Sequence, residues 1–133
     1  MENDICFYDA TELASLIRSK KISAREVLEA HLARIDNVNP QVNAIVTMDA
    51  ERALEEADRA DEEIIKGNNL GLLHGVPVAH KDFIDTSGMR TTYGSPIYAD
   101  HVPDKDALIV ERLTEAGAIS GVKTNPPDFG AGS

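Results

Sequence analysis

Gly75-Val76-Pro77-Val78-Ala79-His80-Lys81-Asp82 is the stretch of sequence that decides the fold of this 133-residue chain. Most of its residues before the histidine are apolar, and its proline stands near the entry, where a β-strand tolerates one. The glycine before it and the polar, glycine-containing loop after it mark the two ends. The pattern therefore predicts a short buried strand that ends at Lys81.

Lys81 is the candidate catalytic residue because of where this strand delivers it. Ligands bind at the carboxyl ends of strands in open α/β sheets. A lysine held there among apolar walls loses its proton more readily than an exposed lysine does. The alternative is a solvated surface charge paired with its neighbour Asp82.

Composition excludes several classes of protein. The charged fraction, 27%, and the hydrophobic fraction, 42%, are those of an ordinary globular protein with one domain. The net charge of −10, from 23 acidic and 13 basic residues, disfavours direct binding of nucleic acid, because phosphate contacts need clustered Lys and Arg. No apolar run reaches membrane-spanning length, and the acidic start is unlike a targeting peptide. We therefore expect a cytoplasmic protein with no membrane partner.

The thiol and imidazole groups predict neither a disulfide nor a metal site. Cys6 is the only cysteine, so no disulfide can form within the chain. The four histidines lack the spacing of zinc ligands. His74 and His80 flank the predicted strand, and for both we favour a hydrogen-bonded structural role over that of a general base. We expect no metal and no cofactor.

The first half of the chain, residues 1–67, reads as a helical region. Asp9 with Glu12, and Ser23 with Glu26, have the spacing of capping boxes that open two helices. We expect the second helix to stop before Pro40. A short strand over residues 42–48 and a third helix from Asp49 to about Lys66 follow.

The second half, residues 68–133, reads as an α/β region. A fourth helix is expected after Asp104 and Asp106, with a buried face of Ile109, Leu113 and Ala116. A second buried strand follows over residues 118–122. Strand, helix and strand in this order form a βαβ-like unit, which implies parallel pairing. Residues 123–133 read as a loop rich in Gly and Pro.

These elements predict an α/β fold in which an N-terminal helical layer packs on an incomplete mixed or parallel sheet. Completed domains seldom finish in a loop directly after a buried strand. We therefore expect residues 1–133 to be the N-terminal part of a single domain, truncated at its C-terminal end.

Several segments together resemble the amidase signature family, over essentially the whole chain and in the order of the family. The strand-and-lysine motif at residues 72–82 carries the strongest likeness. The other matching segments are residues 23–27, 39–44, 91–95, 106–107, 115–118, 123–125 and 129–133.

The resemblance implies hydrolysis of amides or transfer of amide nitrogen. The family uses a nucleophilic serine, a second serine held by a cis peptide, and a lysine that Lys81 matches. The implied role of this lysine is to accept and return a proton through the second serine. A free lysine has a pKa of about 10.4, so work near pH 7 requires a shift of roughly three units, or about 4 kcal/mol.

The chain departs from the family in its serines. The Gly-Gly-Ser-Ser-Gly-Gly stretch has no match here, and neither does the later nucleophile with its glycine-rich oxyanion loop. Ser133 belongs to an earlier motif and is assigned neither role. The resemblance places Gly130, Ala131, Gly132 and Ser133 as lining of the substrate pocket, and the alternative is an ordinary backbone turn.

Three functions stay open at this point. The first is the N-terminal part of a hydrolase that cleaves a small carboxamide through the Ser-cisSer-Lys mechanism, inactive as an isolated chain. The second is the amidotransferase subunit of the same family, which acts on misacylated tRNA with glutamine and protein partners. The third is a non-catalytic interaction module or the remnant of a truncated gene. The identity of the amide and the oligomeric state, including a homo-oligomer, are open as well.

Overall fold

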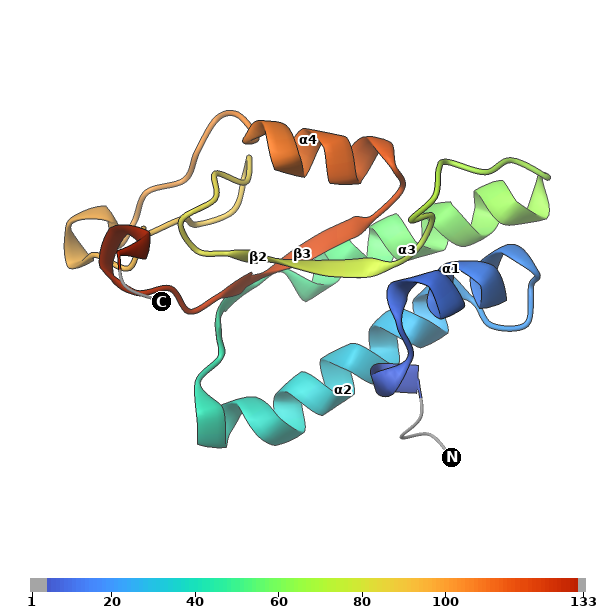
Figure 1. The fold of residues 1–133 in the computed structure, drawn as a ribbon, viewed down its shortest axis with the longest axis horizontal. Coiled ribbons are helices and arrows are strands. Elements are labelled where there is room, and N and C mark those ends of the chain that lie inside the picture. Colours follow the sequence, from blue (N-terminus) through green and yellow to red (C-terminus); the bar gives the residue numbers. More distant parts are fainter. Residues whose placement is uncertain (1–4, 132–133) are drawn as a thin grey trace.

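A small mixed sheet with helices around it is formed by residues 5–131, the part of the chain that the computed structural model describes (Figure 1). The α-helices are α1 (Ala10–Arg18), α2 (Ala24–Val42), α3 (Ala50–Ile65) and α4 (Leu108–Glu115). The strands are β1 (Ile45–Met48), β2 (Pro77–Lys81) and β3 (Ile119–Thr124). Short 3-10 turns are η1 (Ile5–Phe7), η2 (Pro96–Tyr98) and η3 (Asp128–Gly130).

The sheet has the strand order β1-β3-β2. β2 pairs with β3 in parallel, and α4 lies between them in the chain, so the predicted βαβ unit with parallel pairing is confirmed. β1 pairs with the other side of β3 in antiparallel orientation, which makes the sheet mixed. β1 is shorter than the strand predicted over residues 42–48, because the helix before it continues to Val42.

The central strand is β3, and β2 lies at the edge of this sheet. The predicted strand does end at Lys81, but its predicted burial was wrong, because within β2 only His80 is buried. All residues of β3 except Thr124 are buried. The last two of its residues lie beyond the predicted strand of residues 118–122, so Lys123 belongs to a buried strand and not to a loop.

The helices begin where their local sequence signals place them. Asp9 with Glu12 and Ser23 with Glu26 form complete capping boxes at α1 and α2, and Asp49 caps α3. In each box, the first side chain accepts a backbone N–H that would otherwise lack a partner. The predicted starts of these helices are confirmed.

Two helix details differ from the sequence prediction. Pro40 lies inside the last turn of α2, and Asn43, directly after the helix, adopts a left-handed conformation. α4 begins after Ala107, whose side chain cannot cap it, and Asp106 accepts the N–H of Ser87 at 2.6 Å. Its buried residue is Val110, whereas Ile109 is exposed.

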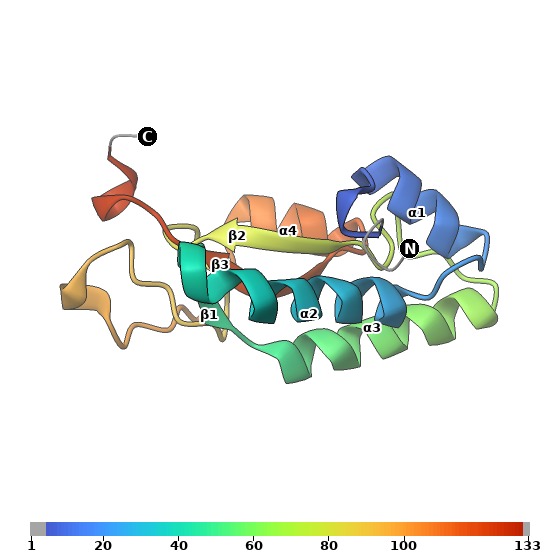
Figure 2. The ribbon, with the colours of Figure 1, turned by 90° about the horizontal axis from the view of Figure 1, so that it is seen from below.

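The main apolar core joins the first three helices to the strands. Figure 1 shows the strands running between α2 and α4, and Figure 2 shows α2 and α3 side by side. Small residues of α3 let the sheet approach closely, since a Cβ added at Gly121 of β3 would lie 2.6 Å from the Cβ of Ala53. The core contains Leu13, Ala14, Ile17, Ala24, Val27, Leu28, Ala53, Ala57, Ala60, Ile64, Val76 and Ile119.

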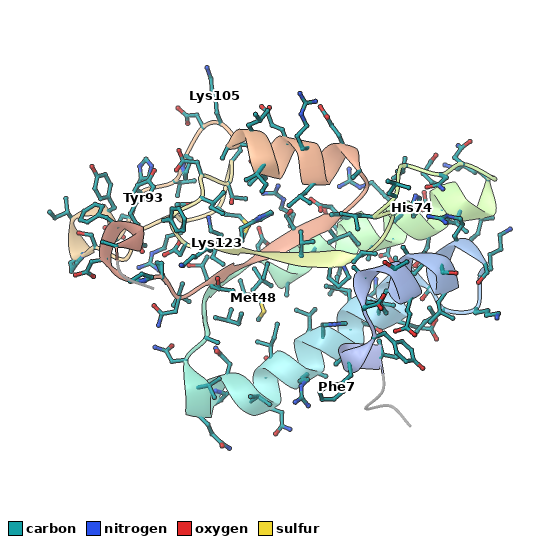
Figure 3. The ribbon with its side chains drawn as sticks, viewed as in Figure 1. Phe7, Met48, His74, Tyr93, Lys105 and Lys123 are labelled. Carbon is teal, nitrogen blue, oxygen red and sulfur yellow. The ribbon has the colours of Figure 1, made fainter. Side chains whose placement is uncertain are left out.

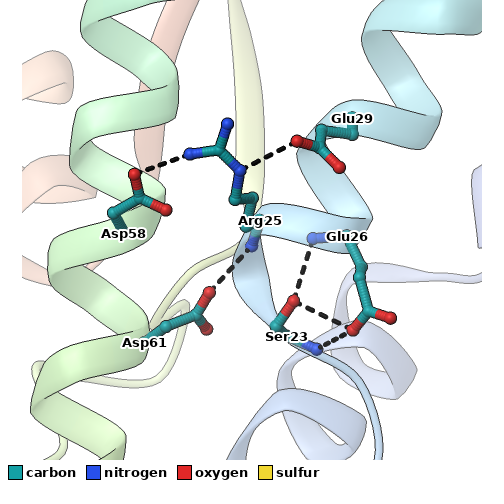
Figure 4. A network of polar contacts seen from close by, with 6 residues as sticks. All are labelled: Ser23, Arg25, Glu26, Glu29, Asp58 and Asp61. Atoms are coloured by element: carbon teal, nitrogen blue, oxygen red, sulfur yellow. Dashed lines mark hydrogen bonds and ion pairs between the residues drawn. The ribbon is translucent and has the colours of Figure 1, made fainter.

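A polar network joins the start of α2 to α3 (Figure 4). The carboxylate of Asp61 accepts the backbone N–H groups of Ala24 and Arg25 at 2.7 and 3.1 Å. The Arg25 guanidinium donates to Asp58 on α3 and to Glu29 on its own helix. A carboxylate at a helix N-terminus satisfies free N–H groups and interacts favourably with the helix dipole, so Asp61 ties the start of α2 to α3.

Within residues 5–131, no helix combines the length and the apolar character needed to cross a bilayer.

Candidate active site

The carboxyl ends of β2 and β3 lie side by side and face two loops. Lys81 and Thr124 are register partners at this end of the parallel pair. The long connection of residues 82–107 and the turn that contains η3 both lie beyond this edge (Figure 1). This is the edge of an α/β sheet at which ligands bind.

Lys81 is half-buried at this edge. Its Nζ lies 5.4 Å from the centroid of the Phe83 ring, within the range of a cation–π contact. The N–H of Ile84 donates to the Lys81 carbonyl at 2.9 Å and closes a tight turn over residues 81–84. The amine is therefore held against an aromatic wall, and the neighbour Asp82 turns its carboxylate elsewhere.

The glycine-rich tail reaches the same aromatic ring. A Cβ built on Gly130 would lie 3.6 Å from Cγ and Cδ1 of Phe83. The Phe83 ring therefore lies close to both the Lys81 amine and Gly130, two residues that the sequence singled out. Ala131 is exposed next to them, and the other two predicted lining residues, Gly132 and Ser133, lie outside the described residues.

Residues 93–98 contact the turn that contains η3 and hold it in place. The N–H of Phe129 donates to the Tyr93 carbonyl at 2.6 Å, and Gly94 packs closely on the Pro127 backbone. Tyr98 makes edge-to-face contacts with both Tyr93 and Phe129. Tyr93 and Phe129 both have positive φ, which bulky residues adopt only where the surroundings fix it.

Tyr93 also joins a polar cluster through its hydroxyl. The hydroxyl donates to the carboxylate of Asp85 and lies 3.4 Å from Nε2 of His101. The bond to Asp85, together with burial, raises the pKa of Tyr93 to about 12. Tyr93, labelled in Figure 3, is therefore protonated at neutral pH and donates to Asp85.

Asp82 anchors the connection that follows β2. This fully buried carboxylate accepts the hydroxyl and the N–H of Thr92, and its own N–H donates to the Thr124 carbonyl at 2.9 Å. Because these bonds use both carboxylate oxygens, Asp82 serves the loop. The sequence also allowed an ion pair between Asp82 and Lys81, but the carboxylate of Asp82 bonds Thr92 instead.

Lys123 is the functional candidate that sequence reasoning missed. Its side chain, labelled in Figure 3, is fully buried. Its Nζ donates to the carbonyl of Ile84 and to the hydroxyls of Thr86 and Thr91, at 2.6 to 3.0 Å. Burial lowers the pKa of Lys123, and the nearby carboxylates, Asp82 foremost, act in the opposite direction. The sequence signals were that residues 119–124 can be read as one strand and that residues 123–125 match a family segment.

The two histidines beside β2 are buried and hydrogen-bonded. Nε2 of His74 lies 2.8 Å from the Ala60 carbonyl, and its Nδ1 accepts the N–H of Leu70, so the ring is the neutral Nε2–H tautomer. Nε2 of His80 lies 2.8 Å from the hydroxyl of Ser120. These contacts agree with the structural role expected for both rings.

His80 predicts a pH dependence of stability. Burial, and then the charge of Lys123, lower the pKa of His80, against a smaller opposing effect of Asp106. The unfolded chain therefore binds more protons just below pH 6.5, and the stabilisation present above that pH is lost as the pH falls. The free energy of unfolding, measured in urea from pH 7.5 to 5.5, should fall less in His80→Gln than in the unsubstituted chain. Equal slopes would contradict the assignment.

Comparison with known proteins places this geometry in a family. Residues 26–133 match the sequence profile described as Amidase. A glutamyl-tRNA(Gln) amidotransferase subunit of Carboxydothermus hydrogenoformans is 43% identical over 130 residues, which cover 98% of this chain and 27% of that protein. The indoleacetamide hydrolase of Bradyrhizobium diazoefficiens is 43% identical over 122 residues, which cover 92% of this chain and 23% of that protein.

A solved structure shows the same arrangement of elements. The fatty acid amide hydrolase superposes on 95% of this chain and 22% of its own, with a TM-score of 0.89 and 26% identity. The chain spans about a quarter of the length of the curated relatives named above. The expected fold class and the resemblance found from the sequence are both confirmed: the chain belongs to the amidase family.

Proposed function

We propose that this chain is the N-terminal part of a single amidase domain and supplies Lys81 to an enzyme that hydrolyses a small carboxamide. The observation that supports it best is the position of the Lys81 amine. It lies at the carboxyl end of a parallel strand, against the Phe83 ring on which Gly130 packs. Sequence identity of 43% to an indoleacetamide hydrolase supports the same reaction class.

The proposed chemistry follows the roles that the family resemblance implies. The second serine takes the proton of the nucleophilic serine as that oxygen attacks the amide carbon, and passes its own proton to the amine of Lys81. The proton returns by the same route to the leaving nitrogen, and water then releases the acid from the acyl-enzyme. Lys81 is thus the proton acceptor and donor, and both serines come from outside these 133 residues.

The proposed substrate lining consists of Gly130, Ala131, Gly132 and Ser133. A glycine backbone lets a ligand approach closely. The contact of Gly130 with Phe83 supports a location next to the Lys81 amine. No cofactor or metal is needed for this chemistry, because serine acyl transfer uses only proton carriers and oxyanion donors.

An assay with two proteins tests this function. The isolated chain should release no ammonia from indoleacetamide above the buffer rate, because it lacks a nucleophile and oxyanion donors. A chimera in which this chain replaces the matching segment of the Bradyrhizobium indoleacetamide hydrolase should hydrolyse indoleacetamide. A folded chimera without activity would favour a non-catalytic module, and turnover by the isolated chain that Lys81→Ala abolishes would refute the prediction of inactivity.

A role within an amidotransferase is the second candidate. Proteins described as subunits of glutamyl-tRNA(Gln) amidotransferase match this chain with 42% to 44% identity in several organisms. The two candidates differ in the amide that is cleaved, which is a small carboxamide for the hydrolase and glutamine for the amidotransferase. A second chimera, built into the Carboxydothermus protein and assembled with its partners, would support this candidate if it released ammonia from glutamine while the hydrolase chimera stayed inactive.

A further inference from the structure

Lys123 is a second buried lysine near the reaction edge, and the proposed chemistry does not use it. We propose that Lys123 is a positioning residue, whose ammonium group fixes the 81–84 turn so that the Lys81 amine rests against the Phe83 ring, on which Gly130 packs. This inference rests on the proposed function only in taking Lys81 as the reactive amine. The contacts that carry it are independent of any reaction.

The hydrogen bonds of Lys123 define it as a charged donor. The Thr86 hydroxyl donates its proton to the Ile84 carbonyl at 3.2 Å, and the Thr91 hydroxyl donates to the Met89 carbonyl at 3.1 Å. Both hydroxyl oxygens can therefore only accept from Nζ. With the Ile84 carbonyl they make three acceptors for the three protons of an ammonium group.

The same contacts exclude Lys123 as the reactive amine. Its side chain is 0% exposed, so no substrate or serine can reach Nζ without displacing the loop. All three of its protons are already donated within the chain. A neutral amine has only two N–H groups and could not donate to all three of these acceptors.

The link from Lys123 to Lys81 runs through one tight turn. Nζ of Lys123 binds the carbonyl of Ile84, and the N–H of the same Ile84 binds the carbonyl of Lys81 at 2.9 Å. Phe83 lies inside this turn, and its ring contacts both the Lys81 amine and Gly130. The ammonium group of Lys123 therefore holds Ile84, the last residue of the 81–84 turn, and the first residue of this turn is the reactive Lys81.

A β-bulge brings Lys123 to this place. Val78 and Ala79 of β2 pair with Ser120 and Val122 of β3, so Gly121 is an extra residue in the ladder. An extra residue changes the side to which the following side chains point. Lys123 consequently pairs with His80, which also contacts Ser120, and all three belong to one buried polar layer behind the 81–84 turn.

The proposal is tested by the NMR signals of Lys81 in the 133-residue chain. The ring current of Phe83 should shift the ε-methylene protons of Lys81 upfield of those of exposed lysines, and Phe83→Leu should remove this shift. Lys123→Met, which keeps an unbranched side chain of nearly the same length without its donors, should also lose the shift. The Ile84 amide should exchange with solvent about tenfold faster or more, as the loss of hydrogen bonds to a charged group predicts.

Methyl signals of Ile17 and Val27, which lie in the apolar core, report whether each variant is folded. A folded Lys123→Met that keeps the Lys81 shift would overturn the proposal. A Phe83→Leu variant with the same Lys81 shift as the unsubstituted chain would overturn it as well. If Lys123→Met does not fold, the isosteric Thr91→Val decides. It removes one acceptor and should weaken the shift, whereas Thr91→Ser should keep it, and an unaltered shift in Thr91→Val contradicts the inference. None of these results depends on hydrolysis, which Lys81→Ala tests separately.

Discussion

Alanine in place of Gly117 should destabilise the chain by about 3 kcal/mol or more, because the added methyl group meets two costs at once. Gly117 has a φ of +91°, a backbone conformation that L-residues with a Cβ adopt only with strain. The Cβ would also lie 2.8 Å from the Cα and 3.1 Å from the backbone nitrogen of His74. Backbone atoms cannot rotate away, so the two segments would have to separate.

The close approach of Gly117 to His74 sets the position of β2 relative to β3. The N–H of Gly75 donates to the Gly117 carbonyl at 2.9 Å, and the N–H of Leu73 donates to the Ala116 carbonyl at 2.8 Å. These bonds join the residues before β2 to the residues before β3. Separation at this point would therefore disturb the strand that carries Lys81.

Gly67 offers the matched control for this prediction. Its φ is +85°, close to that of Gly117, but a Cβ there would meet nothing within 4 Å. Gly67→Ala should therefore cost only the conformational strain, about 1 to 2 kcal/mol. Free energies of unfolding from denaturant titration separate the two cases, and equal losses at both positions would contradict the close approach at His74.

The helix starts were predictable because their signals are local. A capping box needs only two residues three positions apart, and both boxes formed where the sequence placed them. The end of α2 was not predictable from Pro40. Proline has no N–H, yet α2 continues past Pro40 to Val42. Asn43 then adopts a left-handed conformation, and the Asn39 side chain hydrogen-bonds the backbone of Ile45, so the chain can reverse into β1.

The order of the strands could not be predicted from their composition. β2 and β3 both carry a lysine near the end, and the more apolar stretch around β2 suggested the buried position. The central place of β3 depends on β1, which pairs with it across more than 70 intervening residues. The bulge at Gly121 depends likewise on the register between two strands.

The candidate site was predictable only in part. The position of Lys81 at a strand end followed from local pattern, and the structure places it beside Phe83 and Gly130. The buried role of Lys123 did not follow, since its acceptors are 32 to 39 residues away in the chain. A buried lysine is recognised by its hydrogen-bond partners, and partners this distant in the chain leave no local sequence pattern.

Replacement of Lys81 by alanine should lower kcat for amide hydrolysis by about 1000-fold in the indoleacetamide hydrolase chimera, within the range of general acid–base catalysis. The side chain is half-buried and ends against Phe83, so its removal should change the structure little. In the proposed chemistry, this variant lacks the amine that accepts the proton of the second serine.

Lys105 provides the matched control for the loss of a lysine. It is exposed in the connection between η2 and α4, on the outside of the chain (Figure 3). Lys105→Ala should therefore keep the full rate, and the two variants should unfold at similar denaturant concentrations. Similar stability of both variants separates a chemical loss from a structural one.

The most direct test of the account is thus the kcat of the Lys81→Ala chimera with indoleacetamide, compared with that of Lys105→Ala. We expect a folded Lys81→Ala protein whose ammonia release is about 1000-fold slower than that of the control. Ammonia release by folded Lys81→Ala at the rate of the control would show that the amine at the end of β2 takes no part in the chemistry.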